Sequence, residues 1–243
     1  GLRILRVPPV SKLRIRDKQR PGPLFIIIAI YVHFCTSVGP RYMKNRQPYN
    51  LKNTIILYNV SQILMSTYLV YENVRFPNPS QMAAAVWWYL AAKIIELLDT
   101  VFFVLRKRNR QITFLHLYHH SVMPFCAWLG GHGTLLGVIN SFIHIIMYTY
   151  YLISGLGPQY QKYLWWKKHL TTMQLIQFGI IFYHNISAMF SDCTYPKGIN
   201  FLLSANSFLF IYLFGKFYYT NYIKNKKCEQ NVQVTANGKT KVC

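Results

Sequence analysis

Long apolar runs alternate with short polar and basic segments along most of the chain. Most of these runs approach the ~20 residues that an α-helix needs to cross a bilayer, and the first and fourth are marginal in length. Glycine and proline mark several junctions, as in Gly39-Pro40 and Gly157-Pro158. The pattern predicts an all-α, polytopic membrane protein with seven transmembrane helices in one domain. The runs cover residues 23–39, 54–71, 82–105, 112–130, 134–155, 169–190 and 199–223.

The distribution of basic residues predicts how these helices are oriented. Lys and Arg concentrate in the first, third and fifth connections and in the C-terminal tail, whereas the even-numbered connections hold only Arg75 and Lys197. Cytosolic loops concentrate Lys and Arg, so the odd-numbered connections and the C-terminus are expected in the cytosol. Seven spans place the N-terminus across the membrane, although the seven basic residues within 1–20 should resist translocation. We divide the chain into a basic N-terminal segment (1–22), a seven-helix domain (23–223) and a cytosolic tail (224–243).

Composition and charge indicate which partners and which kinds of site to expect. The 243 residues are 52% hydrophobic and carry a formal net charge of +21, which in a soluble chain would suggest a nucleic-acid partner. Here the basic residues lie between apolar runs, so we expect a lipid bilayer around the protein and no nucleic acid. The five cysteines form no CxxC pair, which gives little support to a disulfide framework or a zinc site.

Two acidic residues lie deep in the third apolar run, within "KIIELLDT": Glu96 and Asp99. Charges inside a membrane cost several kcal/mol, and such residues usually face a polar interior as functional groups. Lys93 precedes Glu96 by three positions and Thr100 follows it by four, so a helix would place the three on one face. The segment fits either a functional group or a structural ion pair that locks helices together.

The fourth run begins with "FLHLYHH", in which three histidines have the spacing i, i+3 and i+4 of one helix stripe: His116, His119 and His120. The fifth run adds a second stripe within "NSFIHIIMYTYY", formed by Asn140, His144, Tyr148 and Tyr151. The sixth adds Gln174 and Gln177 on a common face. A lone histidine on an apolar helix is usually a core residue, but four beside buried carboxylates indicate chemistry.

Two kinds of histidine chemistry are consistent with this pattern. Membrane di-iron oxygenases also use HxxHH, but they need several such boxes, and this chain has no second HxxHH and eight histidines in all. A single metal ion on two or three of the histidines stays open. Metal-free imidazole chemistry is favoured, with histidine as nucleophile, base or proton donor near neutral pH.

Four of these segments, "KIIELLDT", "HLYHH", "NSFIHIIMYTYY" and "TTMQLIQF", occur in the order seen in the very-long-chain fatty acid elongases. The chain resembles that family, and its metazoan branch in particular, from about residue 23 to 223. "GPRYMKNRQPYNL" and "LGPQYQKYLWWKK" resemble the family's flanking loops. The resemblance implies a protein of the endoplasmic reticulum membrane whose helices two to seven form a six-helix barrel around an acyl tunnel. It also implies condensation of a long-chain acyl-CoA with malonyl-CoA to 3-ketoacyl-CoA, CO2 and CoA.

Roles for individual residues follow from the same resemblance. His119 is the implied nucleophile, which would form an acyl-imidazole, and His144 would position the thioester carbonyl or assist proton transfer. His116 and His120, with Asn140 and Gln174, would polarise the malonyl carbonyls. Glu96 and Asp99 would orient histidines. The remaining motif residues are expected to support the site: Lys93, Thr100, Tyr148, Tyr151 and Gln177. Cys126 is an alternative nucleophile, because soluble condensing enzymes use cysteine, but it matches no family motif.

The resemblance implies no metal and no cofactor, since decarboxylation supplies the carbanion. The implied partners are the two CoA substrates and the other enzymes of the elongation cycle (ketoacyl-CoA reductase, dehydratase and enoyl reductase), with a homodimer left open. The terminal "KTKVC" resembles a dilysine retrieval signal. Cys193 lacks the loop cysteine with which it pairs in many vertebrate relatives. Two other classes remain alternatives: a metal-dependent acyl-lipid oxygenase and a seven-helix transporter or receptor.

Overall fold

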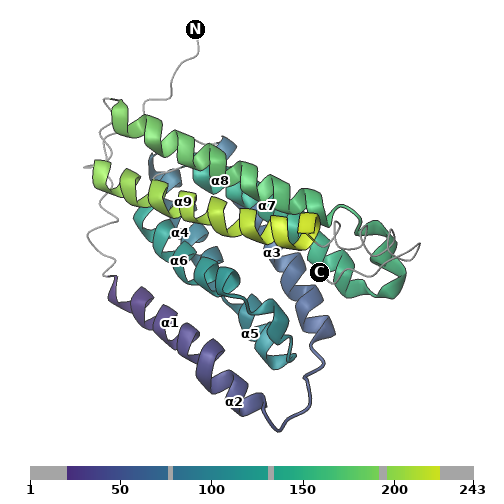
Figure 1. The fold of residues 1–243 in the computed structure, drawn as a ribbon. Coiled ribbons are helices and arrows are strands. Elements are labelled where there is room, and N and C mark those ends of the chain that lie inside the picture. Colours follow the sequence, from purple (N-terminus) through teal and green to yellow (C-terminus); the bar gives the residue numbers. More distant parts are fainter. Residues whose placement is uncertain (1–20, 76–78, 131–133, 192–195, 225–243) are drawn as a thin grey trace.

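Helices form most of the computed structural model (Figure 1), which describes the backbone of residues 21–75, 79–130, 134–191 and 196–224; no strand occurs in this part of the chain. The predicted all-α class is therefore confirmed. Cys193, most of the predicted N-terminal segment and nearly all of the C-terminal tail lie outside the described residues. The α-helices are α1 (Gly22–His33), α2 (Gly39–Met43), α3 (Lys52–Arg75), α4 (Pro79–Ile95), α5 (Leu98–Leu105), α6 (Phe114–Gly130), α7 (Thr134–Leu156), α8 (Lys167–Phe190) and α9 (Lys197–Tyr218).

The first apolar run continues past its predicted end. A π-helical turn at Phe34–Val38 joins α1 to α2, so one helical stretch extends from Gly22 to Met43. Gly39 lies where this stretch meets α5: a Cβ there would lie 2.6 Å from Val104 Cγ1 and 2.9 Å from the carbonyl oxygen of Phe34. The close approach of the two helices therefore depends on a residue without a side chain.

The third apolar run is not one helix, as the sequence pattern predicted, but two. The helix is interrupted at Glu96 and Leu97, between α4 and α5. Here the backbone N–H of Leu97 bonds to the carbonyl of Ile94 at 3.2 Å, and that of Asp99 bonds to the carbonyl of Glu96 at 3.2 Å. These bonds join residues three apart instead of four, so the turn tightens locally. Glu96 thus lies in the break itself.

Three described stretches are long and apolar enough to cross a membrane: Gly22–Met43, Leu135–Leu156 and Lys197–Lys224. The last includes α9 and the π-helical turn Tyr219–Lys224 that follows it. The chain is thus an integral membrane protein by length and composition, and the full count of seven spans stays a prediction. Buried polar residues lower the hydropathy of other helices, as Asn59, Gln62 and Ser66 do in α3.

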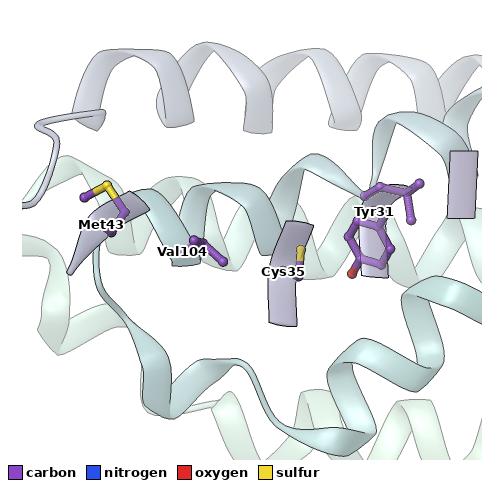
Figure 2. Close-up of a cluster of buried hydrophobic side chains, with 5 residues drawn as sticks. Tyr31, Cys35, Met43 and Val104 are labelled. Atoms are coloured by element: carbon purple, nitrogen blue, oxygen red, sulfur yellow. The ribbon is translucent and has the colours of Figure 1, made fainter. Parts of the chain in front are cut away.

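The longer helices contact one another in a closed order. α3 packs against α4, α4 against α6, α6 against α9, α9 against α8, α8 against α7, and α7 against α3. α1 and α2 lie to one side of this group (Figure 1), where α1 contacts α6 and α2 contacts α5. A buried cluster fills the second contact, and Figure 2 shows four of its members, Tyr31, Cys35, Met43 and Val104; Leu97 completes it.

Candidate active site

A buried ion pair lies at the C-terminal end of α4. Lys93 Nζ donates to both carboxylate oxygens of Glu96, at 2.8 and 2.9 Å, and the two residues are only 2% and 3% exposed. His144 of α7 approaches the same carboxylate, with Nδ1 3.1 Å from Oε1, although the N–H of this ring is not aligned for a hydrogen bond. The ion pair is local to one segment, and the link to a second helix comes through His144.

The first box histidine is held by two threonines. The hydroxyl of Thr113, which precedes α6, accepts a hydrogen bond from the backbone N–H of His116 at 3.2 Å, in the manner of an N-cap. The side chain of His116 makes a second contact, in which Nε2 lies 3.0 Å from Thr100 Oγ1. The Phe103 ring packs against the imidazole with centroids 5.2 Å apart. The helix start and α5 therefore fix the position of this imidazole.

The three box imidazoles form a continuous row along α6. The ring centroids of His116 and His120 are 4.3 Å apart, and those of His119 and His120 are 5.3 Å apart. His119 also packs against Phe210 of α9, at 5.2 Å between centroids. Lys93, Glu96 and His144 are near enough to His119 to interact with it electrostatically. The structure thus brings the HxxHH box, the buried ion pair and His144 together.

The second predicted stripe, on α7, divides its contacts between several partners. Asn140 Oδ1 accepts a hydrogen bond from Tyr89 of α4 at 3.0 Å. Tyr148 is fully buried and donates to Asp99 Oδ2 at 2.9 Å, so the side-chain partner that the structure gives this carboxylate is a phenol instead of an imidazole. Tyr151 is 40% exposed, and its ring lies 6.1 Å from that of Tyr148.

The two glutamines of α8 differ in their surroundings. Gln174 Nε2 contacts Met147 Sδ of α7 at 3.8 Å, and Gln177 is buried. Cys126, the alternative nucleophile, is a free buried thiol that contacts Asn206 Nδ2 of α9 at 3.6 Å. Its described polar contact therefore leads to α9 and not to the histidines.

Comparison with known proteins assigns the family. The profile described as ELO: GNS1/SUR4 family matches residues 18–82 and 74–230. The chain is 38% identical over 256 residues to Very long chain fatty acid elongase 7 of Drosophila melanogaster, covering 94% of this chain and 78% of that protein. It is 37% identical over 251 residues to Very long chain fatty acid elongase 4 of Homo sapiens, covering 92% and 80%. This chain belongs to the ELO (GNS1/SUR4) family.

A third relative matches a smaller share of its own length. The ELO chain is 40% identical over 232 residues to Very long chain fatty acid elongase AAEL008004 of Aedes aegypti, covering 85% of this chain and 65% of the mosquito protein. The chain thus spans just under two thirds of that relative.

Polar residues on α3 of the ELO chain were missed by the sequence analysis. Tyr58 OH lies 3.4 Å from Tyr148 OH and donates to the carbonyl of Ile95 at 3.5 Å, next to the break that contains Glu96. Asn59 and Gln62 are each 2% exposed, and neither Asn59 Nδ2 nor Gln62 Oε1 has a hydrogen-bond partner within the described structure. Their spacing of three within "YNVSQILMS" was a visible signal of a buried polar face.

The described part of the ELO chain contains no group of three His, Cys, Asp or Glu side chains placed to hold a metal ion. The row of imidazoles extends along α6, and the ring of His116 is anchored to a threonine. This arrangement differs from a set of donors that converge on one point. Among these described residues, the side chains are thus not arranged as a set of metal ligands of the kind that the alternative oxygenase would need.

A basic pocket of about 350 Å³ lies at the end of α5, lined by Pro48, Tyr49, Asn50, Arg106, Lys107 and Arg108. Lys107 has a positive φ of 53°, and the helix ends in a Schellman motif: the N–H of Lys107 bonds to Val104 O at 3.0 Å and the N–H of Arg108 to Phe103 O at 2.8 Å. The N–H of Tyr49 bonds to Leu105 O at 3.1 Å, which ties the two loops together. This pocket is lined by residues of two connections that the sequence analysis predicts to be cytosolic.

Proposed function

We propose that this chain is the condensing enzyme of fatty acid elongation, a very-long-chain 3-oxoacyl-CoA synthase. It would join a long-chain acyl-CoA to malonyl-CoA and yield a 3-ketoacyl-CoA two carbons longer, with release of CO2 and CoA. The relatives, named as very long chain fatty acid elongases, support fatty acid elongation in general. The observation that carries the finer proposal is the row of three box imidazoles, which is near enough to His144 and the buried Lys93–Glu96 pair to interact with them electrostatically.

In the first half-reaction, a nitrogen of His119 attacks the thioester carbonyl of acyl-CoA. The C–S bond breaks, an acyl-imidazole forms, and the proton lost by the imidazole leaves with the thiol of CoA. Phe210 and Phe214 flank the His119 ring, at 5.2 and 6.3 Å between centroids. An aromatic wall of this kind excludes water, which protects the acyl-imidazole from hydrolysis.

In the second half-reaction, malonyl-CoA loses CO2 and its α-carbon attacks the acyl carbon. A C–C bond forms, the C–N bond to His119 breaks, and the imidazole regains one proton from solvent. Negative charge develops on the thioester oxygen of the malonyl unit, so donors near His119 lower the barrier. His116, His120, Asn140 and Gln174 are the proposed donors.

His144 has a separate role in this scheme. Lys93 holds Glu96 as a carboxylate, and Glu96 Oε1 faces His144 Nδ1. The negative charge of Glu96, 3.1 Å from Nδ1, favours a proton on that nitrogen and leaves Nε2 to act on substrate, as a carboxylate does for imidazole in hydrolases. We assign His144 to positioning the thioester carbonyl and to proton transfer.

The closed order of helix contacts, from α3 through α4, α6, α9, α8 and α7 back to α3, supports a six-helix barrel around the acyl chain. The basic pocket at Arg106 and Arg108 supports a cytosolic rim, and guanidinium groups are suited to the phosphates of CoA. We place the protein in the endoplasmic reticulum membrane with its C-terminus in the cytosol.

The experiment uses the detergent-purified chain, a panel of acyl-CoA substrates and labelled malonyl-CoA. His119→Ala tests the nucleophile, and His184→Ala is the matched control, because His184 is an exposed histidine on α8. We expect labelled 3-ketoacyl-CoA from the wild type and the control, and none from His119→Ala. Turnover that needs O2 and stoichiometric iron, with no condensation on any substrate, would overturn the proposal in favour of the oxygenase.

A further inference from the structure

A tyrosine of the first helical stretch reaches the histidine box although α1 lies to one side of the main helix group. Tyr31 OH lies 2.6 Å from Thr100 Oγ1, and Thr100 Oγ1 lies 3.0 Å from His116 Nε2. Tyr31 is 5% exposed and Thr100 is fully buried. A chain of two hydroxyl groups therefore connects α1 through α5 to α6, shielded from solvent along most of its length.

The packing around Tyr31 fixes this geometry. Its ring belongs to the buried cluster with Cys35, Leu97 and Val104 (Figure 2), which fills the contact between the first helical stretch and α5. Gly39 allows that contact to be close, because a Cβ there would collide with Val104. The phenol is therefore held in one position, and its oxygen meets Thr100 at a short hydrogen-bond distance.

The number of protons on the hydroxyl groups of Tyr31 and Thr100 limits which tautomer His116 can adopt. Each hydroxyl has one proton to donate, and a phenol is a stronger donor than an alkyl hydroxyl. If Tyr31 donates to Thr100, the proton of Thr100 is free for His116 Nε2, because no other acceptor is described for this hydroxyl. With Thr100 as the donor, Nε2 is the unprotonated nitrogen. A neutral imidazole with an unprotonated Nε2 carries its proton on Nδ1. The order Tyr31, Thr100, His116 thus selects one tautomer.

We propose that Tyr31 is a positioning residue that acts through Thr100 to hold His116 as the Nδ1–H tautomer. In this state Nε2 is occupied by the hydroxyl chain, and Nδ1–H is the one ring donor that His116 can offer to a substrate carbonyl. The tautomer assignment depends only on the contacts of Tyr31 and Thr100. Its catalytic consequence rests on the proposed condensing function, in which His116 polarises a malonyl carbonyl.

The first test is independent of activity and uses 15N NMR of the full chain labelled at its histidines, in detergent. His116→Asn assigns the His116 signals, and we expect a pyridine-like Nε2 and a pyrrole-like Nδ1 in the wild type. A wild-type His116 with its proton on Nε2 would overturn the proposal without any further variant. Tyr31→Phe removes the donor and keeps the ring, and we expect it to raise the Nε2–H fraction.

Two variants separate positioning from general damage. Thr100→Ser keeps the hydroxyl and should retain the wild-type tautomer, whereas Tyr42→Phe removes an exposed phenol of α2 and should leave the His116 signals unchanged. Tyr42 OH bonds to Tyr49 OH at 3.2 Å, away from the box. His116 signals of Tyr31→Phe that match the wild type would overturn the proposal.

Kinetics test the catalytic consequence. Loss of one hydrogen bond that acts on the transition state should lower kcat of Tyr31→Phe about five-fold, with KM for both CoA substrates little changed. Thr100→Ser should retain most of the wild-type kcat. A tautomer shift without a change in kcat would overturn the catalytic role of the two hydroxyl groups. A wild-type protein without condensing activity would instead contradict the proposed function and leave the tautomer result intact.

Discussion

His144 Nδ1 lies 3.1 Å from Glu96 Oε1, and this is the contact through which α7 meets the buried ion pair at the end of α4. Lys93 binds both oxygens of the same carboxylate. Lys93 and His144 therefore both approach one carboxylate, and all three side chains are buried away from solvent. This arrangement allows the two interpretations of the "KIIELLDT" segment, functional group and structural ion pair, to be separated.

Glu96→Gln keeps the shape of the side chain and leaves Lys93 as a buried cation without a carboxylate. Breaking one half of a buried pair costs about 3–5 kcal/mol, whereas replacing both halves is often nearly neutral. We expect Glu96→Gln to lower the free energy of unfolding and to abolish condensation. The double variant Lys93→Met with Glu96→Gln should recover most of the stability and none of the activity.

Unfolding in mixed micelles and condensation assays on the same preparations check this prediction. If the double variant regained activity together with stability, the pair would be structural only, and the role of Glu96 in orienting His144 would be wrong.

Gly39→Ala tests the contact that carries α1 and α2 against α5. The added Cβ would lie 2.6 Å from Val104 Cγ1 and 2.9 Å from a backbone oxygen, so the helices must move apart. Overpacking of this kind costs about 1–3 kcal/mol. Gly179→Ala in α8 is the matched control, because nothing lies within 4 Å of its added Cβ, and alanine favours the helix by ~1 kcal/mol. Thermal unfolding should separate the two variants in opposite directions.

Lys107→Gly should stabilise the end of α5. Lys107 occupies the left-handed position of a Schellman motif with φ of 53°, a conformation that costs a residue with a Cβ about 1 kcal/mol and that glycine adopts freely. The hydrogen bond from Lys107 Nζ to the carbonyl of Lys44, at 3.2 Å, is exposed and offsets little of that gain. Lys107→Val should lower the free energy of unfolding instead. Equal stability of the two variants would contradict the strain assigned to this residue.

Local spacing in the sequence predicted much of the candidate site. The i, i+3, i+4 spacing placed His116, His119 and His120 on one stripe, and these rings do pack in a row. Such positions depend only on helix geometry, which a short stretch of sequence specifies. The all-α class and the approximate ends of most helices could be predicted for the same reason.

Contacts between distant segments could not be predicted in this way. Tyr31 and Thr100 are 69 positions apart, and no local pattern indicates that α1 reaches α5. The break at Glu96 could not be predicted either, because "KIIELLDT" contains neither glycine nor proline, and no local pattern indicates the hydrogen bond between Tyr148 and Asp99. The buried face of α3 is visible in the spacing of Asn59 and Gln62, but uncharged amides on an apolar helix indicate chemistry less strongly than ionisable groups do.

Arg106 and Arg108 provide the last prediction, which concerns the basic pocket at the rim. If these guanidinium groups bind the phosphates of CoA, Arg106→Gln with Arg108→Gln should raise KM for both CoA substrates several-fold, with kcat little changed, because phosphate binding adds the same free energy to ground and transition states. The increase should shrink as salt rises, since screening weakens the wild-type contacts too. Lys162→Gln, an exposed cation in a different predicted cytosolic connection, is the matched control. Steady-state kinetics at two ionic strengths decide the question. An unchanged KM in the double variant would leave these arginines only a role in the orientation of the protein in the membrane, and an equal increase in the control would show that the charge effect is not specific to this pocket.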